Sequence, residues 1–166
     1  MKMSDMQDCA SVSARVLVID DEALVGMLVA DLLRAENLEV SLAHDGTEAL
    51  EIARAHGPDL VVMDWKMPGL SGAELLRALR LVRPGLSVVV FSGCDLTRER
   101  LGEVGGGPEP VLLRKAVELD LLVPAVVEMA RGGAAPVVQH QSDGRACTPA
   151  AYVAQLPRSP LPLRAA

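Results

Sequence analysis

Five short aliphatic runs, which alternate with amphipathic segments, constrain the fold of this chain most strongly. Each run holds four to six residues rich in Val, Leu and Ile, as is typical of strands buried on both faces. The segments between the runs place apolar residues at helical spacing. The predicted strands are Arg15–Ile19, Glu39–Ala43, Asp59–Met63, Leu86–Phe91 and Pro110–Leu113, and the predicted helices are Ala23–Ala35, Thr47–Ala55, Gly72–Arg80, Leu96–Val104 and Glu118–Arg131.

This alternation predicts an α/β domain built on one parallel sheet. Strands that are apolar on both faces need a covering layer on each side, and right-handed crossovers through helices supply those layers. We therefore predict a doubly wound five-stranded sheet with helices on both faces, within residues 14–131. Ser71 is predicted to cap the helix that begins at Gly72, with Glu74 completing a capping box.

The two ends of the chain differ from this domain in composition. Residues 132–166 hold five prolines and three glycines without sustained periodicity, so we expect a disordered tail, and residues 1–13 read as a flexible polar leader. Asp143 and three arginines give the tail a charge of +2, which leaves −8 for residues 1–131 of a chain whose net charge is −6.

Composition also excludes several function classes. An acidic chain with three aromatic residues suits neither general binding to a phosphate backbone nor stacking of single-stranded bases. Cys9, Cys94 and Cys147 are too scattered for a disulfide scaffold or a zinc site. The longest uncharged run, Ala146–Pro157, is too short to cross a bilayer, and the N-terminus lacks a secretory signal. We expect a cytoplasmic protein without membrane contact.

Polar side chains follow four of the predicted strands. Asp20 and Asp21 come after the first strand, Asp64 after the third, Ser92 after the fourth and Lys115 after the fifth. The carboxyl ends of parallel strands lie at one edge of a sheet, where sites form in doubly wound folds. Three carboxylates at close range repel one another unless a cation is present, and Mg²⁺ prefers such oxygen ligands.

Each of these residues also has a purely structural interpretation. Asp20 and Asp21 are suited to cap the following helix, and Asp64 to start an ordinary turn. Ser92 and Lys115 carry little information when taken alone. Because complementary groups occur at four strand ends at once, the sequence favours a pocket for a metal ion and a phosphate group.

The segments around these residues resemble the receiver domain of two-component response regulators, over about residues 14–131. The D-x-x-M-P-x-x-x-G pattern of Asp64–Gly72 is the most specific part of the resemblance. It implies a stand-alone receiver of the chemotaxis type, with a flavodoxin-like sheet in strand order 2-1-3-4-5. The matching segments are VLVIDDE (16–22), DLVVMDWKMPGLSG (59–72), VVVFSG (88–93) and LLRK (112–115).

The resemblance implies a phosphorelay function. Asp64 would accept a phosphoryl group from a sensor histidine kinase or a phosphotransfer protein. Lys115 and the Ser92 hydroxyl would contact phosphoryl oxygens. The signal would leave as protein contact through the face of the fourth helix, fifth strand and fifth helix. Catalysis would be limited to phosphoryl transfer to, and hydrolysis from, the protein's own aspartate.

The resemblance also implies a magnesium site. Asp21 and Asp64 would bind Mg²⁺ directly, Asp20 through water, and Lys66 through its backbone carbonyl. The metal would neutralise phosphoryl oxygens during transfer.

Three features depart from the family pattern. Ala116 replaces the proline that usually follows the lysine through a cis bond, and a trans bond is expected here. Leu112 occupies the position of the usual aromatic switch. Gly105–Pro108 replaces the usual loop before the fifth strand, and Gly93 stands where alanine is common.

We therefore predict a phosphoacceptor that acts without a DNA-binding output domain, because residues 132–166 show no helix-turn-helix pattern. Two alternatives stay close to this reading: a docking module that needs no phosphorylation, and a receiver split from a hybrid sensor kinase. A phosphatase with an aspartate nucleophile would show D-x-D at a strand end, and a nucleotide-binding domain would show a glycine-rich loop after the first strand. Neither pattern is present.

Overall fold

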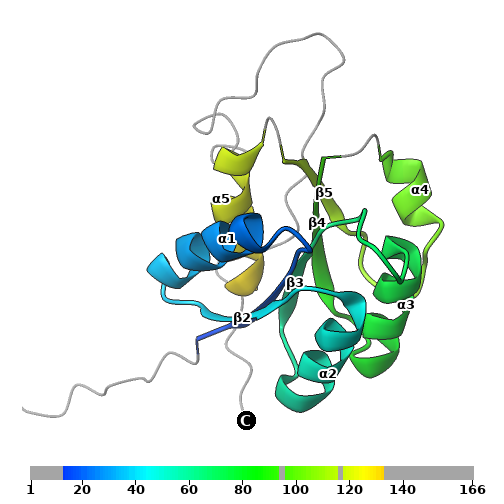
Figure 1. Cartoon of the computed structure of the whole chain (residues 1–166), viewed down its shortest axis with the longest axis horizontal. Coiled ribbons are helices and arrows are strands. Elements are labelled where there is room, and N and C mark those ends of the chain that lie inside the picture. Colours follow the sequence, from blue (N-terminus) through cyan, green and yellow to red (C-terminus); the bar gives the residue numbers. More distant parts are fainter. Residues whose placement is uncertain (1–12, 94–95, 116–117, 133–166) are drawn as a thin grey trace, which may run out of the picture.

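A parallel five-stranded sheet in the order β2-β1-β3-β4-β5 forms the centre of the protein (Figure 1). The computed structural model describes residues 13–132 except 94–95 and 116–117. Most of the predicted leader and tail, all three cysteines and Ala116 therefore lie outside the described residues. The elements are β1 Arg15–Ile19, α1 Ala23–Ala35, β2 Glu39–Ala43, α2 Gly46–His56, β3 Leu60–Met63, α3 Gly72–Val82, β4 Ser87–Ser92, α4 Arg98–Gly102, β5 Val111–Arg114 and α5 Leu119–Ala130.

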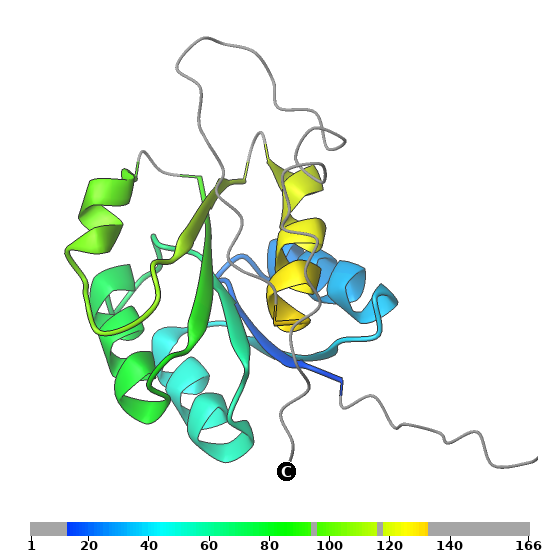
Figure 2. The same cartoon turned by 180° about the vertical axis from the view of Figure 1, so that it is seen from behind.

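Helices cover both faces of the sheet, which confirms the predicted doubly wound fold. Helices α1 and α5 lie on one face, and α2, α3 and α4 lie on the other (Figures 1 and 2). Each face has its own aliphatic core, because alternate residues of a strand point to opposite sides. Leu17 and Met63 belong to the layer under α2 to α4, whereas Val18 and Val62 belong to the layer under α1 and α5.

The helix and strand bounds differ from the prediction by small shifts, except at α4. Strands β3, β4 and β5 each begin one residue later than expected. Helix α4 keeps only five residues, and Leu96 and Val104 are buried outside its regular turns. Gly105 follows in a left-handed conformation, with φ at 59°, which ends the helical path. The capping box of Ser71 and Glu74 is confirmed.

The sheet ladder continues one residue beyond the strands that carry polar groups. The Asp20 N–H donates to the Ala43 carbonyl at 3.1 Å, and the Asp64 N–H donates to the Ile19 carbonyl at 2.9 Å. On the other side, the Lys115 N–H donates to the Ser92 carbonyl at 3.1 Å. These bonds hold the backbones of the candidate site residues to the sheet itself rather than to loops.

At the amino ends of the strands, opposite the candidate site, Asp59 joins three elements. Its carboxylate accepts bonds from the Arg83 guanidinium at 2.7 Å and from the Arg15 N–H at 3.0 Å. The Arg83 guanidinium also donates to the Gly57 carbonyl at 2.7 Å, beyond the end of α2. Asp59 thus connects the starts of β1 and β3 to the end of α3.

We expect Asp59→Ala to lower the free energy of unfolding by about 1–2 kcal/mol. Charge-assisted hydrogen bonds contribute more than neutral ones, and partial exposure of the three side chains reduces that contribution. Urea unfolding followed by circular dichroism measures the change. The control is Asp31→Ala, which removes an exposed ion pair with Arg34 within α1 and should cost less than about 0.5 kcal/mol. Equal effects of the two variants would contradict this assignment.

No helix in the described part of the chain combines the length and the apolar character that crossing a membrane requires.

Candidate functional site

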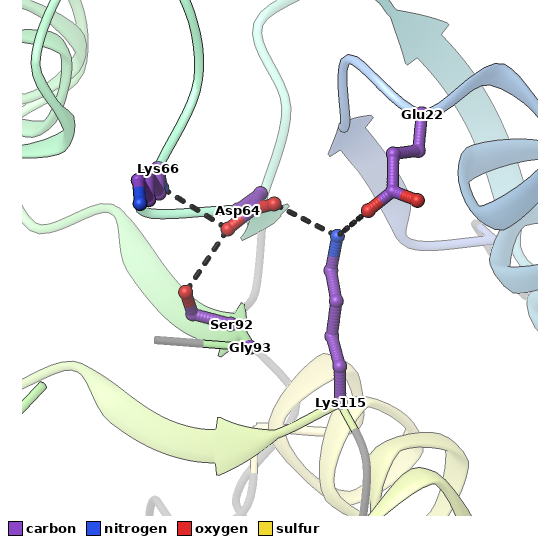
Figure 3. Close-up of a pocket in the computed structure, with 6 residues that line it drawn as sticks. All are labelled: Glu22, Asp64, Lys66, Ser92, Gly93 and Lys115. Atoms are coloured by element: carbon purple, nitrogen blue, oxygen red, sulfur yellow. Dashed lines mark hydrogen bonds and ion pairs between the residues drawn. The ribbon is translucent and has the colours of Figure 1, made fainter. Parts of the chain in front are cut away.

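Asp64 follows β3 and receives donors from three directions (Figure 3). Asp64 is buried, with 7% of its surface exposed. One carboxylate oxygen, Oδ1, accepts from the Ser92 hydroxyl at 3.0 Å and from the Lys66 backbone N–H at 3.1 Å. The other oxygen, Oδ2, lies 2.8 Å from the Lys115 ammonium. The carboxylate is thus held in one orientation by groups from β4, β5 and its own loop.

The Lys115 ammonium lies between carboxylates of two strand ends. It approaches Asp20 Oδ2 at 2.7 Å and Asp64 Oδ2 at 2.8 Å, with Glu22 Oε1 at 3.5 Å. Burial alone would lower the pKa of Lys115, but the hydrogen bonds to Asp20 and Asp64 outweigh it and raise that pKa. Burial raises the pKa of Asp20, while the bond from Lys115 opposes the rise. Lys115 is therefore charged at neutral pH and acts as the counter-ion of this acidic edge.

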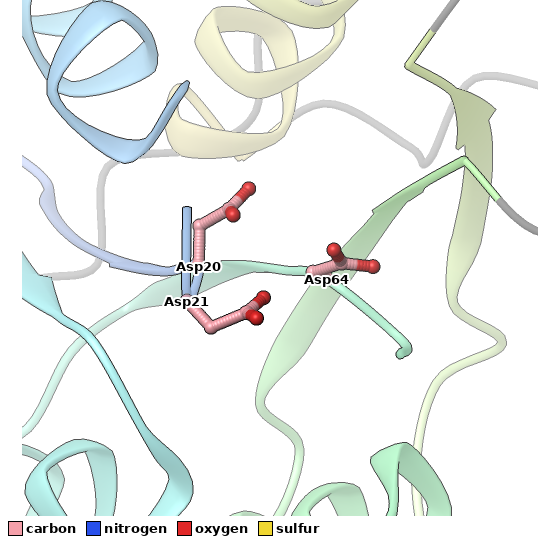
Figure 4. Close-up of side chains that lie close together, drawn as sticks. All are labelled: Asp20, Asp21 and Asp64. Atoms are coloured by element: carbon pink, nitrogen blue, oxygen red, sulfur yellow. The ribbon is translucent and has the colours of Figure 1, made fainter. Parts of the chain in front are cut away.

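Asp20, Asp21 and Asp64 form a compact set of acidic ligands (Figure 4). Each of the three offers a carboxylate oxygen, and these oxygens lie within 4.8 Å of one another. Asp21 is exposed, while Asp20 and Asp64 are buried. Hard oxygen ligands at such spacing, with one open side, fit Mg²⁺, which retains several waters.

The structure does not support the interpretation of Asp20 and Asp21 as helix caps. The N-cap residue of α1 is Glu22, whose side chain makes no capping bond. Asp20 Oδ1 accepts the Glu22 N–H at 2.9 Å, one residue before the helix begins. The Asp21 carboxylate is directed toward the site, on the same side as Asp64 (Figure 4). Both side chains are therefore available to the site.

A pocket of about 250 Å³ opens beside Asp64. Since a water molecule takes about 30 Å³ of liquid volume, this space admits a small anion together with waters. Glu22 belongs to its lining, although the sequence analysis assigned Glu22 no role; its place in the acidic run after β1 was the available signal. The lining residues are Glu22, Asp64, Lys66, Ser92, Gly93 and Lys115.

The loop after Asp64 is packed tightly against the start of α3. A Cβ atom added at Gly72 would lie 2.6 Å from the Trp65 ring and 2.8 Å from the Trp65 carbonyl oxygen. Only glycine therefore lets α3 begin so close to this loop. The Lys66 side chain is exposed and lines the pocket, while its N–H is bonded to Asp64.

Leu112 occupies the position at which an aromatic switch was excluded from the sequence. It is 4% exposed and packs in the aliphatic layer under α2 to α4. Phe91, the nearest aromatic residue along β4, packs in the opposite layer. Leu112 is therefore a residue of the aliphatic core, at the position where an aromatic switch is usual in the family.

Comparison with known proteins identifies relatives of this domain. A sequence model of the response regulator receiver domain matches residues 16–106. The transcriptional regulatory protein PdtaR of Mycobacterium tuberculosis is 40% identical over 120 residues, which are 70% of this chain and 57% of that protein. The chain spans about half the length of the curated relatives that it matches.

Solved structures show the same architecture. The signal receiver domain of the putative response regulator NarL from M. tuberculosis aligns with a TM-score of 0.60 and 31% identity, over 72% of this chain and 98% of that one. A CheY-like receiver domain protein from Methanospirillum hungatei aligns with a TM-score of 0.64 over 71% of this chain and 94% of that one. At 24% identity, the second match bears on the fold alone.

Proposed function

This chain belongs to the family of response regulator receiver domains, which act in two-component signal transduction, and we propose that it accepts a phosphoryl group on Asp64. The convergence of Ser92, Lys115 and the Lys66 N–H on the Asp64 carboxylate carries the proposal. An isolated turn aspartate needs no such set of donors. The donor would be a phosphohistidine on a sensor kinase or a phosphotransfer protein.

The proposed transfer is a substitution at phosphorus. A carboxylate oxygen of Asp64 attacks the phosphorus atom, the P–N bond to the donor histidine breaks, and its electron pair stays on the ring nitrogen. The ring leaves as neutral imidazole, because one of its two nitrogens carries or takes up a proton. Lys115 and Ser92 already donate to Asp64 from two sides, so they are placed to donate to the phosphoryl oxygens after transfer. The chemistry needs no rearrangement of the sheet.

Asp20, Asp21 and Asp64, with the Lys66 backbone carbonyl, would hold Mg²⁺. The bound metal would supply positive charge to the phosphoryl oxygens as charge develops on them. Of these residues, Asp20 is also bonded to Lys115, so metal and ammonium share the same acidic edge. The Asp20 side chain therefore suits the water-mediated position better than a direct one.

Trp65, the only tryptophan of the chain, gives a direct test of the proposed site. It adjoins Asp64 and is partly buried. We expect its fluorescence to change on addition of Mg²⁺, to change again on addition of beryllofluoride as a phosphoryl mimic, and to recover with EDTA. Beryllofluoride should have no effect without Mg²⁺. A chain that binds Mg²⁺ but never responds to beryllofluoride would contradict the proposal.

An apolar stripe on α1 supports a protein as the phosphoryl donor. Leu24, Met27, Leu28 and Leu32 share one face of the helix and are 37–83% exposed. Contiguous exposed apolar surface marks interaction sites. The stripe begins two residues after Glu22, which lines the pocket, so a donor placed over Asp64 would cover it.

We expect the double variant Leu24→Glu with Leu28→Glu to slow phosphoryl transfer from a histidine kinase that labels the wild type. The loss should reach at least about tenfold, because charge placed in an apolar contact must be desolvated. Labelling by acetyl phosphate, which needs no docking, should be unchanged. The control is Leu81→Glu, which alters a leucine that is 85% exposed on α3. Equal slowing by both would show that α1 is not the donor surface.

We further propose that the phosphorylated state signals by protein contact through α4, β5 and α5, the face joined to Ser92 and Lys115. Arg114, the exposed residue of the otherwise buried β5, comes directly before Lys115. A shift of Ser92 or Lys115 toward a phosphoryl group would therefore act directly on the residues next to that face.

A further inference from the structure

A buried arginine lies in the last turn of α3, far from the pocket. Arg80 is 5% exposed, and no ion pair among the described residues involves it. Its Nε atom is buried without a hydrogen-bond partner in the described structure. Burial lowers the pKa of the guanidinium, but arginine keeps its charge in proteins. A buried cation without an acidic partner is costly, so its contacts call for an explanation.

Arg80 holds the loop between α4 and β5. Its two terminal nitrogens donate to the carbonyl oxygens of Gly105 and Pro108. Gly105 and Gly106 have φ angles of 59° and 80°, so the chain turns around the guanidinium. A Cβ atom added at Gly107 would lie 2.8 Å from Arg80 Nε. We call Arg80 with these two carbonyls the Arg80 anchor.

The anchor holds one end of the segment that joins β4 to β5, in which the helix is short. Helix α4 has five residues, and Leu101 is its buried core residue. The chain leaves α4 and runs beside α3 toward the start of β5 (Figure 2). The other end of the segment leads back to Ser92 and Gly93 at the pocket. One end of the segment therefore meets the proposed phosphorylation site, and the other end is fixed near the amino end of β5.

We propose that the Arg80 anchor is the fixed end about which α4 pivots when the pocket changes state. A shift of Ser92 and Gly93 would move the leading end of the segment, while Arg80 keeps Gly105 and Pro108 against α3. The motion becomes a swing of α4 instead of a displacement of the whole segment. This inference rests on the proposed function of Asp64 and adds the element that shapes the response.

Hydrogen–deuterium exchange of the full chain tests the anchor. In the wild type with Mg²⁺ and beryllofluoride, we expect exchange to change in residues 98–102 and to stay unchanged at Val104 and Gly105, whose N–H groups donate to the Leu101 and Gly102 carbonyls. Arg80→Met keeps the apolar stem but removes both donors. It should accelerate exchange at Leu101, Val104 and Gly105, whose N–H groups are hydrogen-bonded in the structure, by at least about tenfold without any ligand. Labelling of Asp64 by acetyl phosphate should stay within about twofold of the wild type, since Arg80 lies at the far edge of the sheet.

Two further variants keep the test decisive. Arg77→Met alters an exposed arginine one turn earlier on α3 and should exchange as the wild type does. Gly107→Ala crowds Arg80 from the loop side and should reproduce the effect of Arg80→Met. It decides the test if Arg80→Met perturbs the whole domain, which faster exchange in β1 would show. The inference is overturned if both anchor variants exchange as the wild type does, or if exchange at Val104 and Gly105 rises with beryllofluoride as much as it does in α4. A wild type that ignores beryllofluoride would refute the proposed function, whereas the ligand-free comparison of variants would still judge the anchor.

Discussion

Asp64→Asn is expected to abolish incorporation of phosphate from labelled acetyl phosphate. The amide keeps the shape of the side chain but loses the anionic oxygen that attacks phosphorus. The other acidic residues offer no substitute, because the Ser92 hydroxyl and the Lys66 N–H both bond to Asp64. Incorporation is measured on the purified chain with Mg²⁺, and the label from the wild type should be labile to hydroxylamine, as an acyl phosphate is.

Asp31→Asn is the matched control for this experiment. Asp31 lies on the exposed face of α1, and its one ion pair among the described residues is with Arg34. It should incorporate phosphate as the wild type does. Label that persists in Asp64→Asn would place the acceptor elsewhere, and an unlabelled wild type would leave the phosphorylation-independent docking module as the better reading.

Lys115→Met is expected to lower the free energy of unfolding by about 3 kcal/mol at pH 7 in the presence of a chelator. The variant leaves Asp20 and Asp64 buried, at 3% and 7% exposure, with no counter-charge between them. Breaking a buried ion pair by removing one partner costs about 3–5 kcal/mol, and protonation of a carboxyl limits that cost. Phosphate incorporation should fall as well, because the ammonium no longer faces the phosphoryl oxygens.

The pH dependence of this variant follows from the sign of the shift. Burial already raises the pKa of Asp20, and loss of Lys115 removes the interaction that opposes the rise. A carboxyl whose folded pKa exceeds its unfolded pKa stabilises the fold below the unfolded value, and that contribution is lost as pH rises through the folded value. The deficit relative to the wild type should therefore grow from about pH 4 upward.

Magnesium should partly restore the stability of Lys115→Met, since it replaces the missing positive charge. The control is Arg114→Met, which removes an exposed cation one residue earlier and should change stability by less than about 0.5 kcal/mol. If Lys115→Met unfolded at the same urea concentration as Arg114→Met, Lys115 would not be the counter-ion of this edge.

Much of the fold was predictable because local and global signals agree. The runs Val16–Ile19 and Leu60–Met63 are apolar at every position, as is typical of strands covered on both faces. Strand periodicity then placed Asp20 and Asp64 at the carboxyl edge. The capping box at Ser71 was readable because it depends on residues three apart in the chain.

Features that depend on contacts between distant segments were not predictable. Arg80 ends a helical pattern, where a charged side chain is expected to face water, yet Gly105 and Pro108 bury it. The short α4 ends on Gly102, and Gly105 and Gly106 follow it with positive φ angles. The contact of Glu22 with Lys115 joins residues 93 positions apart, and no local pattern encodes it.

The ladder bonds beyond the strand ends divide this site into two kinds of parts. The backbones of Asp20, Asp64 and Lys115 belong to the hydrogen-bonded sheet, so moving any of them would disturb the core. Glu22, Lys66 and Gly93 reach the same pocket from turns and loops. Substitution or insertion in those turns leaves the ladder intact. Changes in those turns can therefore reshape the rim of the pocket, while the sheet keeps the backbones of the proposed phosphoacceptor and of its counter-ion in place.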